Sequence, residues 1–151
     1  MDIIKLNQAL AAQVLTLTME TIKECYPKYY PVGAVDFFLK HHELSTIIKD
    51  IDEERVYGVM NEGQLLGTIS IHQNEIYRLF VLPSYQGQGI GHLLMNFGEG
   101  VIAKSFSVGT VDSSLPGKTF YLKRGYREMS YHTILTENGD FLCYDVMEKR
   151  F

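Results

Sequence analysis

Three glycines and two glutamines gather in one short stretch of the chain. Residues 86–92 read Gln-Gly-Gln-Gly-Ile-Gly-His and follow an apolar run that ends at Leu82 and Pro83. Glycine lets the backbone turn sharply and come close to a ligand, because it carries no Cβ atom. A helix that starts directly after such a loop presents unpaired N–H groups and the positive end of its dipole. The stretch therefore predicts an anion site, most naturally for a phosphate, with a plain glycine-rich surface turn as the alternative.

The glycine spacing fits neither of two common nucleotide-binding motifs. In a dinucleotide fingerprint, G-x-G-x-x-G, the third glycine after Gly87 and Gly89 would stand at the position of His92. No segment of the chain fits the full P-loop pattern G-x-x-x-x-G-K-[ST]. The strand that precedes the loop also belongs to a predicted antiparallel meander rather than to a βαβ unit. We therefore look for a different phosphate-bearing ligand.

The elements that must position this loop follow from apolar spacing and turn signals. Strands are predicted over residues 2–6, 55–60, 65–71, 75–82, 106–112, 126–135 and 141–148, and helices over 8–24, 34–49 in two short pieces, 89–104 and 116–124. Neither a linker nor an internal repeat interrupts this order. We expect a single mixed α+β domain that spans residues 1–151.

Composition and charge exclude several classes of protein. The 46% of hydrophobic residues and 21% of charged residues exclude a disordered or fibrous chain. The formal net charge of −4 argues against a protein that coats nucleic acid. The charge is uneven, because residues 75–127 carry a net +3 and the rest of the chain −7. This distribution suggests a basic part that holds an anion.

Cysteine usage and hydropathy indicate a cellular compartment. Cys25 and Cys143 stand far apart without a C-x-x-C pair, which is typical of a reducing compartment and excludes a zinc site. No metal site is expected elsewhere, because the five histidines are scattered. The longest apolar runs fall far short of the ~20 residues of a membrane helix, and no signal peptide is visible. We expect a cytoplasmic protein that contacts no membrane.

At this point the sequence resembles a known family. Gln86, Gly89 and Gly91 are similar to the Q/R-x-x-G-x-G/A signature of the Gcn5-related N-acetyltransferases, the GNAT family. The stretch from Phe120 to Tyr126 resembles the family's second signature, F-Y-x-K-x-G-F/Y, and the element order matches over nearly the whole chain. The resemblance implies a GNAT-like fold, with a central, mostly antiparallel, twisted sheet of about seven strands flanked by about four helices.

The resemblance also implies an acetyl-CoA cofactor. Main-chain N–H groups of the loop would hold the pyrophosphate, and the end of the preceding strand would pair with the pantetheine like an additional strand. The family often has Arg or Lys in this loop, where this chain has neutral glutamines, so Lys118, Lys123 or Arg124 would contact the outer phosphate. Ser114 stands where the family often has an asparagine near the thioester. The implied cofactor residues are Leu79, Phe80, Val81, Gln86, Gly87, Gln88, Gly89, Ile90, Gly91, His92, Ser114 and Lys123.

Acetyl transfer to an amine needs a base and a proton donor. An alkylammonium has a pKa near 10 and must lose a proton before it attacks, and the departing thiolate is helped by an acid. Tyr121 matches the family tyrosine that commonly supplies this proton; the alternative is a packed helix aromatic. Glu75 stands where some family members place a general base; the alternative is a solvated carboxylate at a strand end.

The acceptor side is predicted from the segment after the first helix, which usually lines the acceptor pocket in the family. Here it supplies aromatic residues with polar tips, which suit a small amine or a peptide end: Tyr26, Tyr29, Tyr30 and Phe38. Packing of the two short helices is the alternative for each of them. His41 and His42 either relay protons or lie on an ordinary surface. The acidic run from Asp50 to Glu54 is interpreted as a solvated face that could attract a cationic acceptor.

These observations predict an acyltransferase. The expected reaction is direct transfer of an acetyl group from acetyl-CoA to a primary amine of a small molecule or peptide. The alternative is a CoA-binding sensor or interaction module with weak or no activity, for which the neutral glutamines and Ser114 leave room. The closing strands leave a homodimer open, and nucleic acid is not an expected partner.

Overall fold

The computed structural model describes residues 1–151 and contains one seven-stranded sheet. The strands are β1 (Asp2–Lys5), β2 (Val56–Asn61), β3 (Gln64–His72), β4 (Glu75–Val81), β5 (Val108–Ser113), β6 (Arg127–Leu135) and β7 (Phe141–Arg150). Their order across the sheet is β1-β2-β3-β4-β5-β7-β6. All neighbours are antiparallel except β4 and β5. The predicted mixed α+β fold with a mostly antiparallel sheet is confirmed.

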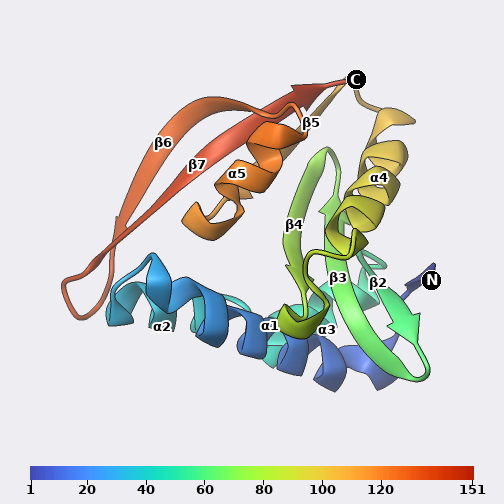
Figure 1. Ribbon diagram of the computed structural model, residues 1–151, viewed down its shortest axis with the longest axis horizontal. Helices are drawn as coiled ribbons and strands as arrows, with labels where there is room; N and C mark the ends of the chain where they lie inside the picture. Colours follow the sequence, from blue (N-terminus) through green and yellow to red (C-terminus); the bar gives the residue numbers. More distant parts are fainter.

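The helices form two layers around this sheet (Figure 1). They are α1 (Ala11–Cys25), α2 (Val32–His41), α3 (Leu44–Asp52), α4 (Ile90–Ala103) and α5 (Leu115–Lys123). The two short helical pieces predicted over 34–49 are confirmed as α2 and α3, which His42 and Glu43 separate. The count is therefore five, where the family resemblance implied about four. None of the helices is long and apolar enough to cross a membrane.

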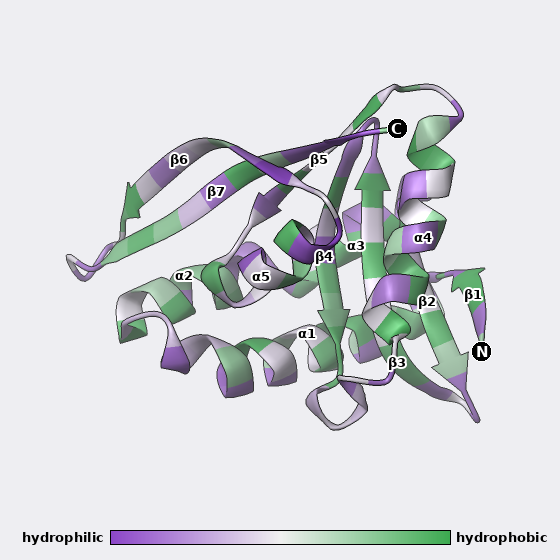
Figure 2. Ribbon diagram, turned by 45° about the horizontal axis from the view of Figure 1, so that its top comes forward, coloured by the Kyte–Doolittle hydropathy of each residue, from purple (hydrophilic) through white to green (hydrophobic).

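The two faces of β3 show how the layers pack. Gly67 and Ile69 face α4, and the helix comes so close that a Cβ atom on Gly98 would lie 2.8 Å from Ile69 Cδ1. Thr68 and Ser70 point the opposite way, because side chains alternate along a strand. Ser70 Oγ accepts from Arg78 Nη1, and Arg78 also binds His42 and Asp50 from the α2–α3 region. The hydrophobic colouring of the central strands in Figure 2 reflects this burial on both faces.

A bulge in β4 opens the sheet. Tyr77 pairs with Ser70 and Phe80 with Thr68, so two residues of β4 lie opposite one of β3. Arg78 at the bulge has a φ of +46°, in the left-handed region. The pairing of β4 with β5 stops after Glu75–Thr110 and Ile76–Val111. Beyond these two pairs the strands separate, and no strand pairs with β4 on the β5 side from Tyr77 to Val81.

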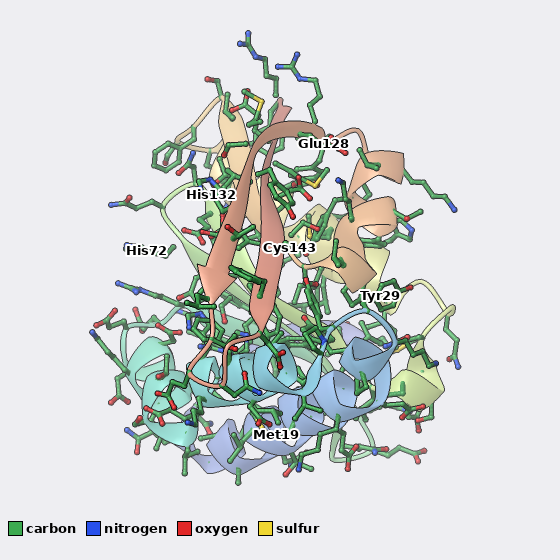
Figure 3. All side chains as sticks on the ribbon, turned by 90° about the vertical axis from the view of Figure 1, so that its left-hand side faces the viewer. Met19, Tyr29, His72, Glu128, His132 and Cys143 are labelled. Carbon is green, nitrogen blue, oxygen red and sulfur yellow. The ribbon has the colours of Figure 1, made fainter.

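The β6–β7 hairpin stands over the layer formed by α1 and α2, with His132 on β6 and Cys143 on β7 (Figure 3). The turn of the hairpin is fixed to α2, because the backbone N–H of Gly33 donates to Asp140 Oδ2 at 2.8 Å. The helix α2 begins after Pro31 without a side-chain cap of its own. Asp140 therefore supplies an acceptor to the first turn of α2 from the far end of the chain.

Candidate active site

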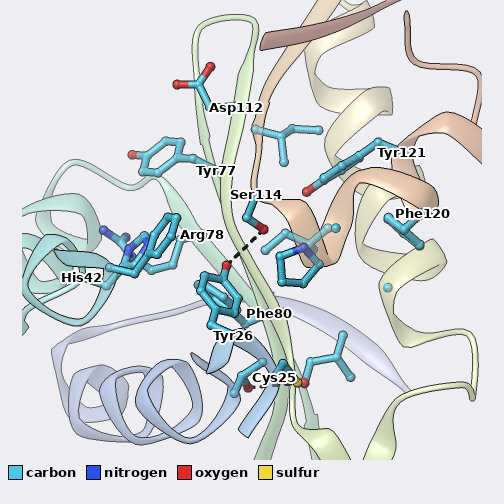
Figure 4. Close-up of a pocket in the computed structure, with 18 of the residues that line it drawn as sticks. Cys25, Tyr26, His42, Tyr77, Arg78, Phe80, Asp112, Ser114, Phe120 and Tyr121 are labelled. Carbon is cyan, nitrogen blue, oxygen red and sulfur yellow. Dashed lines mark hydrogen bonds between the residues drawn. The ribbon is translucent and has the colours of Figure 1, made fainter. Parts of the chain in front are cut away.

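A cleft of about 1100 Å³ lies where β4 and β5 separate. The glycine loop lines one part of it, and Glu75 and Asp112 line another. Tyr26, Ser114 and Tyr121 lie between these parts, with the hydroxyl of Tyr121 directed into the cleft (Figure 4). The splayed strands thus join the predicted cofactor loop and the predicted acceptor side in a single cavity.

The loop after β4 carries free backbone donors. Gly87 and Gly89 have φ angles of +77° and +87°, which favour glycine, and a Cβ atom on either would meet nothing within 4 Å. Helix α4 begins at Ile90, and no side chain caps it. The N–H groups of residues 87–92 have no hydrogen-bond partner in the protein. This open cradle of six donors at a helix N-terminus fits a pyrophosphate.

Gln86 fixes the start of the loop. Its side-chain Nε2 donates to the Val81 carbonyl at 3.0 Å, and its backbone N–H donates to Pro83 O at 3.3 Å. Gln86 therefore braces the loop against the end of β4, and the free donors begin at Gly87. The side chain of Gln88 is exposed and does not line the cleft.

Most basic side chains of the 75–127 segment are neutralised inside the protein. Lys118 lies 3.0 Å from Glu128 and 3.1 Å from Asp145, and Arg124 binds Glu99 at 2.9 Å. Arg78 and Arg127 also form ion pairs, with Asp50 and Glu148. Only Lys104 and Lys123 of the six take part in no ion pair. The net +3 of this segment therefore overstates the charge available to a ligand, and of the three candidate phosphate partners Lys123 is the unpaired one.

Tyr121 and Ser114 both line the cleft (Figure 4). Tyr121 is 9% exposed, and its hydroxyl has no hydrogen-bond partner in the protein. Burial raises the pKa of Tyr121 above its usual value, so the hydroxyl keeps its proton at neutral pH. Ser114 Oγ lies 3.3 Å from Tyr26 Oη. Burial also raises the pKa of Tyr26, to about 12, so Tyr26 is a second protonated phenol at the cleft.

Glu75 is half-buried at the start of β4 and lines the cleft. Burial, and then the negative charge of Asp112, raise the pKa of Glu75 above its usual value. A raised pKa makes a carboxylate a better base. Glu75 pairs with Thr110, and Ser114 stands four positions further along the chain, about 13 Å at the rise of a strand. Glu75 therefore lies far from Ser114 and would reach that region through water.

The predicted acceptor aromatics divide into two groups. Tyr26, Tyr29 and Phe38 line the cleft, with Phe37, His41 and His42 beside them. Tyr30 does not line it: its hydroxyl accepts from the Leu115 N–H at 2.7 Å and donates to the Cys143 carbonyl at 2.9 Å. The structure thus corrects the prediction for Tyr30, whose buried side chain ties the segment before α2 to α5 and β7.

A buried ionic cluster was missed by the sequence analysis. Arg78 Nη1 donates to Asp50 Oδ2 at 2.8 Å and to Ser70 Oγ at 3.2 Å, and its Nε donates to His42 Nδ1 at 3.2 Å. Asp50 is only 6% exposed, so the prediction of a solvated face from Asp50 onward is wrong at its first residue. An arginine in the middle of an apolar central strand was the available signal, because such a charge must find a buried partner.

Comparisons with known proteins agree with this architecture. A sequence model of the acetyltransferase (GNAT) domain matches residues 25–141. An uncharacterized N-acetyltransferase of Bacillus thuringiensis is 26% identical over 151 residues, covering 83% of this chain and 94% of that protein. One of Bacillus anthracis is 27% identical over 134 residues, covering 72% and 85%.

Two crystal structures share the fold. A GCN5-related N-acetyltransferase from Rhodopseudomonas palustris has a TM-score of 0.90 at 21% identity and covers 99% of this chain and 95% of that one. The PaiA N-acetyltransferase from Thermoplasma acidophilum, solved with coenzyme A, has a TM-score of 0.77 at 21% identity and covers 99% and 98%. The chain belongs to the GNAT family of acetyltransferases, which are acyltransferase enzymes.

Proposed function

We propose that this protein is an acetyl-CoA-dependent N-acetyltransferase that moves an acetyl group directly to a primary amine of a small molecule or peptide. The observation that carries the proposal is the run of six unpartnered N–H groups from Gly87 to His92, beside a free edge of β4. Backbone donors bind the pyrophosphate, and the Leu79–Val81 edge binds the pantetheine as an added strand. Acetyl-CoA supplies an activated thioester when bound.

The residues of the cleft divide the proton transfers between them. Tyr121 keeps its proton and faces the cleft, so it is placed to protonate the departing thiolate. Glu75, with its raised pKa, accepts the proton of the attacking ammonium through water. Ser114 offers a hydroxyl near the thioester, although it is shared with Tyr26.

Two measurements test the proposal. Thermal melts with acetyl-CoA test binding, because a ligand that prefers the folded protein must raise its stability. Release of free CoA is then followed across a panel of amines and peptides. Stabilisation together with amine-dependent CoA release is the expected result. Binding without turnover for any amine would favour the CoA-binding sensor, and no stabilisation well above micromolar concentrations would exclude both functions.

A further inference from the structure

Two hydrogen-bond donors of the buried cluster remain free at the cleft. Arg78 uses Nε and Nη1 inside the cluster, and its Nη2 has no partner. His42 accepts at Nδ1, and its Nε2 has no partner either. The fully buried polar atoms that lack partners are Thr18 Oγ1 and Tyr77 Oη alone. Each of the two free donors therefore keeps a small solvent-accessible surface, and both residues line the cleft.

The position of the proton on His42 is fixed by Arg78. An arginine is always protonated and can only donate, so Nδ1 of His42 must be the acceptor. The single proton of the neutral imidazole then sits on Nε2. Burial, with the charge of Arg78, lowers the pKa of His42 to about 3. His42 thus presents a permanent N–H donor and cannot act as a base near neutral pH.

The donor pair of His42 and Arg78 lies in the same cleft as Tyr26 and Ser114. The ring of His42 packs edge-on against Phe80 at 5.4 Å between centroids, and Phe80 is 6.4 Å from Tyr26, the partner of Ser114. A chain of three contacts, through Phe80 and Tyr26, thus connects the His42 ring to Ser114.

We propose that His42 Nε2 and Arg78 Nη2 form an acceptor subsite for a neutral carbonyl oxygen, so that the amine acetylated by this enzyme carries an amide carbonyl, as a peptide or an amino-acid amide does. The inference rests on the proposed transferase function. Arg78 acts as a positioning residue, because it sets the proton on His42.

Charge distinguishes a carbonyl from a carboxylate in this subsite. Asp50, 2.8 Å away, already neutralises Arg78. Glu75 and Asp112 line the same cleft, and burial raises the pKa of both carboxyl groups. The carboxylate of an acceptor would add a third negative charge to the cleft that Glu75 and Asp112 line, and this is disfavoured. A neutral oxygen accepts from both donors without this cost.

Three acceptors with the same isobutyl group test the proposal: leucinamide, leucine and 3-methylbutylamine. They present an amide, a carboxylate and no carbonyl, and they are compared at equal concentrations of unprotonated amine. We expect kcat/KM to be highest for leucinamide. In His42→Phe the ratio of kcat/KM for leucinamide to that for 3-methylbutylamine should fall about threefold to tenfold, the loss of a hydrogen bond. His42→Gln, which keeps an N–H donor, should restore part of the ratio. His132→Phe, at an exposed histidine of β6 that does not line the cleft, should leave the ratio as in the wild type.

A binding readout separates this inference from the transferase proposal. In protein with ¹⁵N-labelled imidazoles and bound CoA, His42 should carry its proton on Nε2 from pH 5 to 8, and leucinamide but not 3-methylbutylamine should shift that resonance. Arg78→Lys keeps the charge beside Asp50 but lacks the Nε–H donor. In this variant the imidazole proton of His42 should no longer be confined to Nε2. If leucinamide shifts the resonance and no amine is acetylated, the transferase proposal fails and the subsite stands. Two results would overturn the subsite. One is acetylation by His42→Phe with the wild-type ratio of kcat/KM for leucinamide to that for 3-methylbutylamine, and the other is a His42 resonance that leucinamide does not shift.

Discussion

Arg78 Nη1 lies 2.8 Å from Asp50 Oδ2, and the exposed fractions of the two residues are 5% and 6%. The pair joins the bulge of β4 to helix α3, and Arg55 approaches the other oxygen of Asp50 at 3.6 Å. The same strand segment separates from β5 to form the cleft. One buried ion pair therefore holds α3 against the strand that borders the cleft.

Removing the carboxylate of this pair should destabilise the protein strongly. Asp50→Asn leaves the buried guanidinium of Arg78 without its counter-ion, which costs about 3 kcal/mol. Urea unfolding monitored by circular dichroism measures the change. Asp52→Asn is the matched control in the same helix: Asp52 is exposed and binds only Gln8, so its effect should stay within ~0.5 kcal/mol. Equal effects of the two substitutions would show that the buried pair contributes little.

Tyr121→Phe should lower kcat about 100-fold, because general acid catalysis contributes at least this factor. The KM for acetyl-CoA should change little, since the substitution removes only the hydroxyl. Tyr131→Phe, at an exposed tyrosine of β6 that does not line the cleft, serves as the control and should keep a kcat close to that of the wild type. A Tyr121→Phe enzyme with wild-type turnover would assign the proton donor elsewhere, with Tyr26 as the next candidate.

The acid limb of the pH–rate profile should report Glu75. Because burial and Asp112 raise its pKa, kcat/KM should begin to fall at a pH above the usual pKa of a glutamate. Asp112→Asn removes the neighbouring negative charge, lowers the pKa of Glu75 and should move the limb to lower pH. Glu75→Gln should abolish the limb together with most activity. A limb that stays in place in Asp112→Asn would belong to another group.

The raised pKa of Glu75 also has a consequence for stability. A carboxyl group whose pKa is higher in the folded than in the unfolded state favours folding at low pH, and this contribution is lost as the pH rises through the folded value. The ionised Glu75 therefore costs stability at pH 7. Glu75→Gln should raise the melting temperature at pH 7, and the gain should disappear below pH 4.

Two glycines of helix α4 should respond differently to alanine. A Cβ atom on Gly100 would meet nothing within 4 Å, so Gly100→Ala should stabilise the protein by about 1 kcal/mol, the difference in helix propensity. On Gly98 the Cβ atom would lie 2.8 Å from Ile69 Cδ1 and 3.0 Å from Ile76 Cδ1. Overpacking offsets the gain there, so Gly98→Ala should be less stable than Gly100→Ala by at least ~1 kcal/mol. Chemical unfolding of both variants makes the comparison.

Lys123 should contribute to binding of the outer phosphate of CoA. Lys123→Gln should raise the KM for acetyl-CoA about threefold at low ionic strength and less in 0.5 M salt, because an exposed charge is screened. Lys104→Gln, also without an ion pair but at the end of α4 remote from its N-terminus, should leave the KM as it is. Equal changes of the KM in the two variants would indicate that Lys123 acts through the overall charge of the protein surface rather than through a contact with the phosphate.

The glycine loop from Gly87 to Gly91 was predictable because its conformation depends on residues that are close in sequence. Glycine spacing from Gly87 to Gly91 specifies a loop whose φ angles and free N–H groups depend on neighbours in sequence. Apolar runs bounded by turn signals likewise predicted the seven strands and the meander, since both signals are local in the sequence. A helix N-terminus and a strand edge arise within about twenty residues, and a single sequence contains that information.

The opposite side of the cleft depends on contacts between residues that are distant in sequence. Only the tertiary structure determined which of these residues pair and which face the cleft. Asp50 and Arg78 are 28 positions apart, and neither residue type shows which partner it finds. Tyr30 and Tyr26 have similar neighbours in sequence, yet one hydroxyl bridges Leu115 and Cys143 while the other faces the cleft. The sequence by itself thus determined the fold class and the glycine loop with its free N–H groups. The bulge at Arg78, the buried cluster and the fixed donor on His42 became visible only in three dimensions, because burial and pairing are properties of the packed chain.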